Sequence, residues 1–300
     1  MIDAPSSTWF TSSPHWNWLI VVYFSLGALA GGLYFLSAMI DLTGRDRRMA
    51  RLGYYMTLPI LLVIGGVLIV DLYRPDRFWH LFVEIHNWRP MFKWWVPMSV
   101  GAWGVLLFGF FALLSCLAAL AGHRAWRWRF PLRLRPPGVL GTLVAVCGAM
   151  VALLVTGYTG VMLSVLNRPV WSDTPLFGLL FLVSAVTMAA ALLALVNRWM
   201  HGDSPVVAAL HRIWISLLLV QIVVWIALFV TLGPAVRGWL NGWGVVLAIG
   251  IAIGIVLPLL AARRPTAGGV GGLPAAAALV VAGGVIVRTA IVFVPEAIAP

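Results

Sequence analysis

Residues 138–165 read GVLGTLVAVCGAMVALLVTGYTGVMLSV and contain no charged side chain. The stretch lacks the strict alternation of a half-buried strand, and it is longer than the roughly 20 helical residues needed to cross a bilayer core. Seven further stretches of this kind fill the chain. The eight expected spans are 16–40, 53–73, 94–121, 138–165, 175–197, 211–233, 238–261 and 273–294. Because backbone groups inside a bilayer must be satisfied by a helix or a closed barrel, the sequence predicts an all-α integral membrane protein with eight transmembrane helices.

The composition supports a single membrane domain. Of the 300 residues, 62% are hydrophobic and 10% are charged, and no soluble stretch separates the spans. We expect a short non-cytoplasmic segment over 1–15, followed by one membrane domain over 16–300. Its helices are expected to form two four-helix bundles, one over about 16–165 and one over about 175–294. Residues 1–15 lack the basic start of a signal peptide, so we expect the first apolar stretch to remain as a span.

Arginine is distributed unevenly between the two sides. The loops on one side contain thirteen arginines, whereas those on the other side contain six basic residues. The thirteen are Arg45, Arg47, Arg48, Arg51, Arg124, Arg127, Arg129, Arg133, Arg135, Arg198, Arg212, Arg263 and Arg264. Basic residues in short loops stay in the cytoplasm, so both termini are predicted on the non-cytoplasmic side of a bacterial or archaeal cell inner membrane. The net charge of +11 therefore indicates topology and lipid contacts rather than nucleic acid binding.

The chain carries few residues of the kinds that hold redox centres. Cys116 and Cys147 both lie in spans, and two thiols are too few for an iron–sulfur cluster. The six histidines lie in loops or at span ends, so no pair of axial haem ligands is predicted inside the bundle. A phosphate-binding glycine-rich loop is also missing from the sequence. We therefore expect no haem, no iron–sulfur cluster and no metal site in this chain.

Polar side chains gather toward the side opposite the arginine-rich loops. Tyr23 and Tyr158 lie about 10 Å inside the first and fourth spans, by the helical rise per residue. Asp71 and Arg74 end the second span, and His86 lies in the loop that follows. Polar groups at membrane depth are costly, which makes each of them a functional candidate. A quinone ring, with two carbonyls and a tail in lipid, is the kind of ligand that two tyrosine hydroxyls at this depth suit.

Each of these residues also has a structural interpretation. Tyr23 and Tyr158 are residue types that anchor helices at the membrane interface or bond one helix to another. Asp71 and Arg74 have the spacing of an ion pair that ends a helix. Arg288, near the end of the last span, is long enough to extend to the headgroups.

Four stretches in order resemble one family. GYTGVMLS at 157–164, followed by NRPVW at 167–171, resembles the signature around the fourth helix of the NrfD/PsrC family, the membrane subunit of polysulfide reductase. Residues 18–32 resemble that family's first helix, 71–75 (DLYRP) the end of its second, and 97–103 (PMSVGAW) the start of its third. Residues before Pro97 depart from the family pattern, which has a serine there.

The resemblance implies a haem-free subunit that binds menaquinone or ubiquinone as a substrate. Its partner would be a ferredoxin-like iron–sulfur subunit, together with a molybdopterin catalytic subunit or a cytochrome. Tyr158 carries over as a hydrogen-bond donor to the quinone. Tyr23 lies near a first-helix position where the best-known member has a histidine. Arg74 falls in the motif at the end of the second helix and is a further candidate for the quinone site.

We hypothesise an electron-transfer subunit of a quinone-linked oxidoreductase complex, which holds the quinone site but not the site of the other substrate. Asp71 and His86 are the candidates for proton transfer. A carboxylate beside a guanidinium titrates low, so Asp71 fits an orienting role, whereas an imidazole near neutrality fits proton transfer.

Two other functions stay open. A proton channel or transporter-like subunit would need polar residues through the midplane, where the sequence offers Thr142, Ser184 and Gln221. A purely structural anchor would share the fold and the partner but bind no quinone.

Overall fold

The computed structural model describes residues 16–72, 74–121, 130–201, 205–262 and 273–298. Within them, eight helical stretches are long and apolar enough to cross a membrane, which confirms the predicted all-α membrane fold. They are α1 (Trp18–Thr43), α2 (Arg47–Asp71), α3 (Pro97–Ala121), α4 (Val139–Val165), α5 (Phe177–His201), α6 (Pro205–Leu232), the α7 (Gly242–Ile251) to α8 (Leu257–Ala262) span, and α9 (Leu273–Phe293). A π-helical segment, η5 (Ala252–Val256), joins α7 to α8 without a break.

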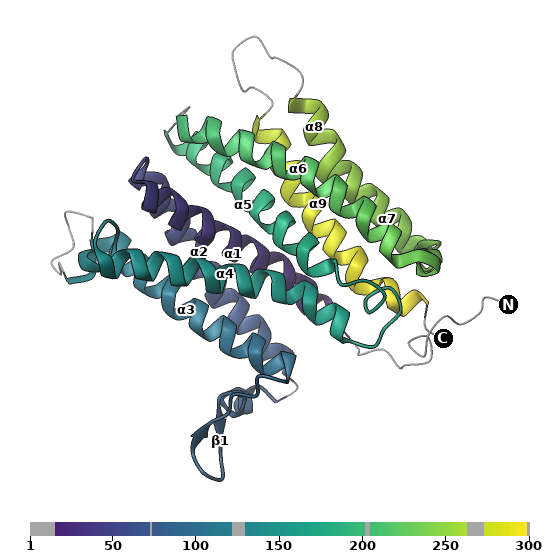
Figure 1. The fold of residues 1–300 in the computed structure, drawn as a ribbon, viewed down its shortest axis with the longest axis horizontal. Coiled ribbons are helices and arrows are strands. Elements are labelled where there is room, and N and C mark those ends of the chain that lie inside the picture. Colours follow the sequence, from purple (N-terminus) through teal and green to yellow (C-terminus); the bar gives the residue numbers. More distant parts are fainter. Residues whose placement is uncertain (1–15, 73, 122–129, 202–204, 263–272, 299–300) are drawn as a thin grey trace.

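Helices α1 and α5 form the centre of the molecule. In each of these two helices, 72% of the most apolar 18-residue stretch is buried inside the protein. The corresponding share is 28% in α2 and 33% in the α6 span. Helix α1 packs against α2, α4 and α5, and α5 packs in turn against α4, α6 and α9. In Figure 1, α2, α3 and α4 lie on one side of this centre, and α6, α7, α8 and α9 lie on the other. The boundary between two bundles at 165–175 stays a prediction, because α1, α4 and α5 share one continuous packing surface.

Two helices begin earlier than the apolar pattern indicates. Helix α2 begins at Arg47 rather than at 53, because Asp46 caps it by accepting hydrogen bonds from the backbone N–H groups of Arg48 and Met49. The turn before it is short because Gly44, at φ 65°, ends α1 in the left-handed conformation. Helix α6 similarly begins at Pro205 rather than at 211. The arginines predicted for these loops therefore lie partly on helices.

The long connection between α2 and α3 is folded rather than irregular. It comprises a 3₁₀ segment, η2 (Pro75–Leu81), and a small antiparallel pair, β1 (Val83–Glu84) with β2 (Arg89–Pro90). The rings of Trp79 and Trp88 stack at 6.1 Å across it. This hairpin extends beyond the ends of α2 and α3 (Figure 1). It was not among the elements that the sequence predicts, since two-residue strands carry no readable alternation.

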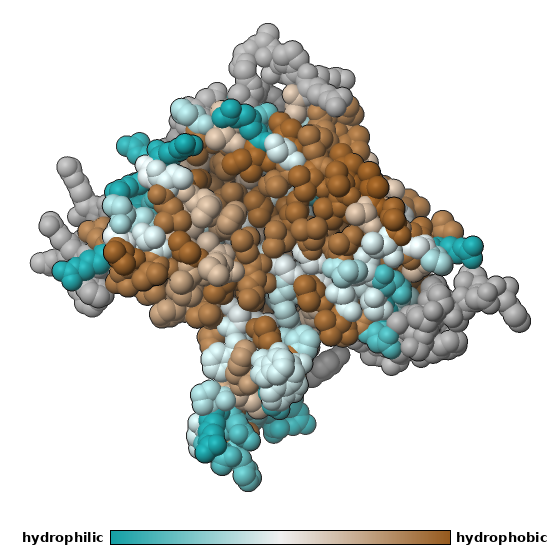
Figure 2. Space-filling view, viewed as in Figure 1, coloured by the Kyte–Doolittle hydropathy of each residue, from teal (hydrophilic) through white to brown (hydrophobic). Residues whose placement is uncertain are grey.

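The surface divides by polarity. Figure 2 shows apolar residues across the sides of the helices, with hydrophilic residues at their ends and on the hairpin. An apolar side surface of this kind suits contact with lipid. We name the two ends of the bundle by their content. The hairpin end carries the start of α1, the end of α2 and the end of α9, and the arginine-rich end carries the α1–α2 turn.

Candidate functional site

Tyr158 lies on α4, and its ring packs against α3 at a position where a glycine has no side chain. Gly101 of α3 is buried, and a methyl group in place of its hydrogen would overlap the Tyr158 ring. The glycine thus allows the aromatic ring to lie directly on the neighbouring backbone. The Tyr158 hydroxyl donates to the sulfur of Met162 at 3.5 Å, one turn further along α4. A thioether is a weak acceptor, so this hydroxyl remains available to a better one.

Tyr23 lies on α1 and faces the same region. Its side chain is 5% exposed, and its ring packs 5.4 Å from that of Phe24. Helix α1 packs directly against α4, the helix that carries Tyr158. The structure therefore places the two tyrosines that the sequence singled out on neighbouring helices, α1 and α4.

Asp71 is the last residue of α2 and is bound to the start of α1. The side-chain amide of Asn17 donates to the Asp71 carboxylate at 2.9 Å, while its oxygen accepts from the backbone N–H of Leu19 at 2.8 Å. Asn17 thus caps α1 and joins it to α2 at once. Among the described residues no ion pair links Asp71 to Arg74, so the predicted pairing of these two residues is wrong. The reason is geometric, because α2 ends at Asp71 and Arg74 begins the next segment, exposed to solvent.

His86 lies away from the tyrosines. It is in the turn between β1 and β2 and is exposed. Since His86 belongs to that hairpin, which extends beyond α2 and α3 (Figure 1), it lies outside the helical part, and Arg74 is exposed directly before η2. Of the five residues selected from the sequence, Tyr23, Tyr158 and Asp71 are held within the helical part.

The stretches that resemble one family also meet in space. The ring of Tyr158, on α4, packs directly on Gly101 at the start of α3. A methyl group at Gly31 of α1 would likewise overlap Thr156 of α4. The indole of Trp103 donates to the carbonyl of Met91 at 3.0 Å, which binds the hairpin to α3. The motif residues are therefore mainly those that let α1, α3 and α4 approach one another.

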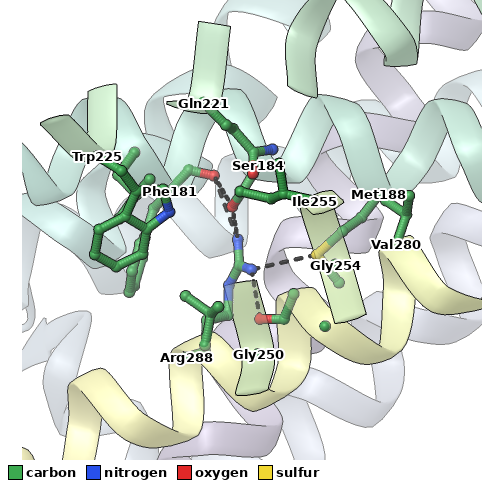
Figure 3. A pocket seen from close by; sticks show the side chains of 14 residues that line it. Phe181, Ser184, Met188, Gln221, Trp225, Gly250, Gly254, Ile255, Val280 and Arg288 are labelled. Atoms are coloured by element: carbon green, nitrogen blue, oxygen red, sulfur yellow. Dashed lines mark hydrogen bonds between the residues drawn. The ribbon is translucent and has the colours of Figure 1, made fainter. Parts of the chain in front are cut away.

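A second polar cluster lies between α5, α6, α7 and α9 (Figure 3). Arg288 of α9 is 1% exposed and points into the protein, so its side chain does not extend to the headgroups. Its guanidinium donates to Ser184 of α5 at 2.7 Å and lies over the Phe181 ring at 4.9 Å. The residue types were visible in the sequence as polar groups in apolar spans. Their meeting was not, because it depends on how α5 and α9 pack.

A third buried polar group, at the arginine-rich end, was missed by the sequence reasoning. Asp41 of α1 accepts hydrogen bonds from Arg135, the shortest at 2.8 Å, and Arg135 also donates to the carbonyl of Arg47 at 3.0 Å. Nearby, Tyr34 shares a hydrogen bond of 2.8 Å with Ser115. The available signal was an aspartate within an otherwise apolar helix.

The connection from α4 to α5 is anchored at the hairpin end. The Trp171 indole donates to the carbonyl of Ile291 in α9 at 2.6 Å. Arg168 is almost fully buried beside it; burial lowers the pKa of its guanidinium, and the negative charge of Glu296 acts in the opposite direction. The connection thus fixes the end of α4, and with it Tyr158, relative to α9.

Among the described residues, no three His, Cys, Asp or Glu side chains come together as a metal site would require. Cys116 and Cys147 are both free thiols.

Comparison with known proteins gives two matches. A family model described as "Polysulphide reductase, NrfD" matches residues 10–298. A curated protein, "Protein NrfD homolog" of Haemophilus influenzae (strain ATCC 51907 / DSM 11121 / KW20 / Rd), is 25% identical over 274 residues, which cover 82% of this chain and 82% of the relative.

Proposed function

Since the chain belongs to the NrfD family of membrane subunits of polysulphide-reductase-like complexes, we propose that it binds quinone or quinol between α1, α3 and α4 and exchanges electrons with an iron–sulfur subunit. The observation that supports this most is the position of Tyr158. Its hydroxyl is held two turns inside the end of α4, over Gly101, and Tyr23 lies on α1, which packs against α4. A hydroxyl at that depth reaches a headgroup whose tail remains in lipid.

The two tyrosines have distinct roles in this proposal. Tyr158 donates to one carbonyl oxygen of the quinone, exchanging the weak contact with Met162 for a stronger acceptor. Tyr23, enclosed between α1 and its neighbours, lies near the other oxygen.

Oxidation of one quinol releases two electrons and two protons. The electrons pass to a ferredoxin-like iron–sulfur subunit, which works with a molybdopterin catalytic subunit or a cytochrome. The protons leave toward the hairpin end, where Asp71 is held by Asn17 and where Arg74 and His86 face solvent. Reduction of quinone runs the same steps in reverse. This chain supplies the quinone site, and its partners supply the redox centres.

We place the protein in the cell inner membrane, with both termini on the non-cytoplasmic side. The argument is the distribution of basic residues, since the short turn between α1 and α2 and the helix ends beside it carry Arg45, Arg47, Arg48 and Arg51. The quinone site then lies in the non-cytoplasmic leaflet.

The test is Tyr158→Phe in the intact complex. Losing one hydrogen bond to the quinone is expected to lower quinol-dependent turnover and inhibitor affinity by about tenfold. The matched control is Tyr55→Phe, because the Tyr55 hydroxyl of α2 has no hydrogen-bond partner among the described residues. Wild-type turnover and inhibitor binding in Tyr158→Phe would contradict the site.

Proton translocation is a second candidate function. The polar groups at the arginine-rich end favour it, because Asp41, Arg135, Tyr34 and Ser115 place titratable and hydroxyl groups inside the bundle. Proteoliposomes of the full chain without any redox partner test it directly. A proton flux that Asp41→Asn abolishes while the protein stays folded would support a conduction role, and an absence of flux in the wild type would contradict it.

A further inference from the structure

Arg288 places a positive charge inside the second group of helices. It lies on α9, more than a turn before that helix ends at Phe293, and 1% of its surface is exposed. Ionisable groups at membrane depth are costly, and they are normally paired or face a water-filled space. The question is what balances this charge.

The contacts of the guanidinium are all with neutral groups. Nη1 donates to the carbonyl of Gly284 at 3.1 Å and to the sulfur of Met188 at 3.2 Å. Nη2 donates to the Ser184 hydroxyl at 2.7 Å and to the carbonyl of Phe181 at 3.3 Å. The remaining donor, Nε, is enclosed and has no partner in the described part of the chain.

No described carboxylate compensates the charge. The ion pairs found among the described residues are Arg77 with Asp76 and Arg135 with Asp41, and neither includes Arg288. The acidic residues in these ranges lie in loops or near helix ends, as Asp173 and Glu296 do. The compensation that a buried cation requires is therefore missing from the described side chains.

A cavity lies beside this guanidinium (Figure 3). Arg288, Ser184, Gln221 and Trp225 line it together with glycines of α7, η5 and α9. Its volume of about 20 Å³ is enough for one water-sized species. The π-helical turn η5 contributes to its wall, and such turns are frequent at functional sites.

We propose that this cavity binds one small monovalent anion, of the size of chloride, as the counter-ion of Arg288. A neutral water in the cavity would leave the charge uncompensated, whereas an anion compensates it. The lining also suits an anion, because it combines the positive charge of Arg288 with no carboxylate. The volume excludes anions much larger than the halides. The site lies among α5, α6, α7 and α9, so the proposal does not depend on quinone binding at Tyr158.

The test uses the full chain purified in mild detergent. Its thermal unfolding midpoint is measured while chloride replaces gluconate at constant ionic strength. Because a ligand that binds only the folded state stabilises it in proportion to ln(1 + [L]/Kd), the midpoint is expected to rise with the logarithm of chloride concentration. Bromide should replace chloride in this effect, and gluconate, which is too large for the cavity, should not.

Two variants separate this site from general salt effects. Arg288→Gln should lose the chloride dependence, while Arg237→Gln, which removes an exposed arginine from η4 (Gly233–Trp239), should keep it. A chloride dependence that is absent in the wild type, or equal in the wild type and Arg288→Gln, would overturn the proposal.

A measurement on the wild type covers the case in which Arg288→Gln does not fold. Crystals of the full chain soaked in bromide should show an anomalous peak in the cavity beside Arg288. A map with no peak there would also overturn the proposal.

Discussion

Gly101 controls where the Tyr158 ring lies, because a single hydrogen is all that separates the α3 backbone from that ring. The position therefore matters to the site although glycine carries no chemistry of its own. It also explains why a motif at the start of α3 and another near the end of α4 belong together. The motif in α3 provides the space for the ring, and the motif in α4 provides the tyrosine hydroxyl.

Gly101→Ala is expected to displace the Tyr158 ring and lower quinol-dependent turnover by about tenfold or more, since a shift of about 1 Å is enough to disturb a positioned group. Gly109→Ala is the matched control, because a methyl group there meets nothing within 4 Å. Turnover of both variants is measured in the intact complex. Equal activities for the two would show that the ring position is not critical.

Asp71→Asn separates the charge of this residue from its hydrogen bond. The amide oxygen can still accept from Asn17, so the helix ends should stay joined. If the carboxylate takes a proton from the quinol, turnover should fall by about a hundredfold, the scale of general base catalysis. Asp76→Asn, on the exposed η2 segment, serves as the control. Unchanged turnover in Asp71→Asn would mean that Asp71 has a structural role only.

The sequence identified the site residues by type and depth, but not by partner. Tyr23 and Tyr158 were predicted because a hydroxyl at membrane depth is costly wherever it points. The predicted partner of Asp71 was wrong. Its hydrogen bond comes from Asn17, at the start of α1, which packs against α2, and not from a residue further along the same helix. Spacing within a helix is readable in a sequence, whereas contacts between helices depend on the tertiary fold.

At the scale of elements, the ion pair of Asp41 with Arg135 joins α1 to the segment before α4. Both side chains are nearly buried, at 1% and 10% exposure, in contrast to 74% and 56% for Asp76 and Arg77. An exposed pair contributes little, whereas breaking a buried pair leaves an uncompensated charge.

Asp41→Asn is therefore expected to lower the free energy of unfolding by about 3–5 kcal/mol. Asp76→Asn should change it by about 1 kcal/mol or less. Thermal unfolding of the purified chain in detergent compares the two variants. Midpoints that fall equally would mean that the buried pair has no special weight in the stability.

The spans were predicted to within a few residues because each is a continuous apolar run. Their starts at Arg47 and Pro205 were placed too late, since apolar windows end at the first charged residues while helix caps do not. The β1–β2 hairpin could not be predicted, because Val83–Glu84 and Arg89–Pro90 are too short to show a period.

At the scale of the whole molecule, the proposed orientation puts the hairpin outside and the α1–α2 turn in the cytoplasm. Asn87→Cys in the hairpin turn and Thr43→Cys at the end of α1 both introduce thiols at exposed positions. In sealed, right-side-out cells, a membrane-impermeant maleimide should label the first and not the second. The native thiols, Cys116 and Cys147, lie inside spans and provide the background measurement. Labelling of Thr43→Cys without labelling of Asn87→Cys would show that the orientation is the opposite of the one proposed.

The first and last spans touch at the hairpin end. The ring of Trp18, in the first turn of α1, lies 4.9 Å from that of Phe293 at the end of α9, and α1 is among the most buried helices of the chain. A ribosome delivers α1 to the membrane before α9. The central helix therefore stays without one of its neighbours until α9 has been synthesised. A chain truncated before α9 would keep an apolar surface uncovered, which makes it a substrate for membrane quality-control proteases.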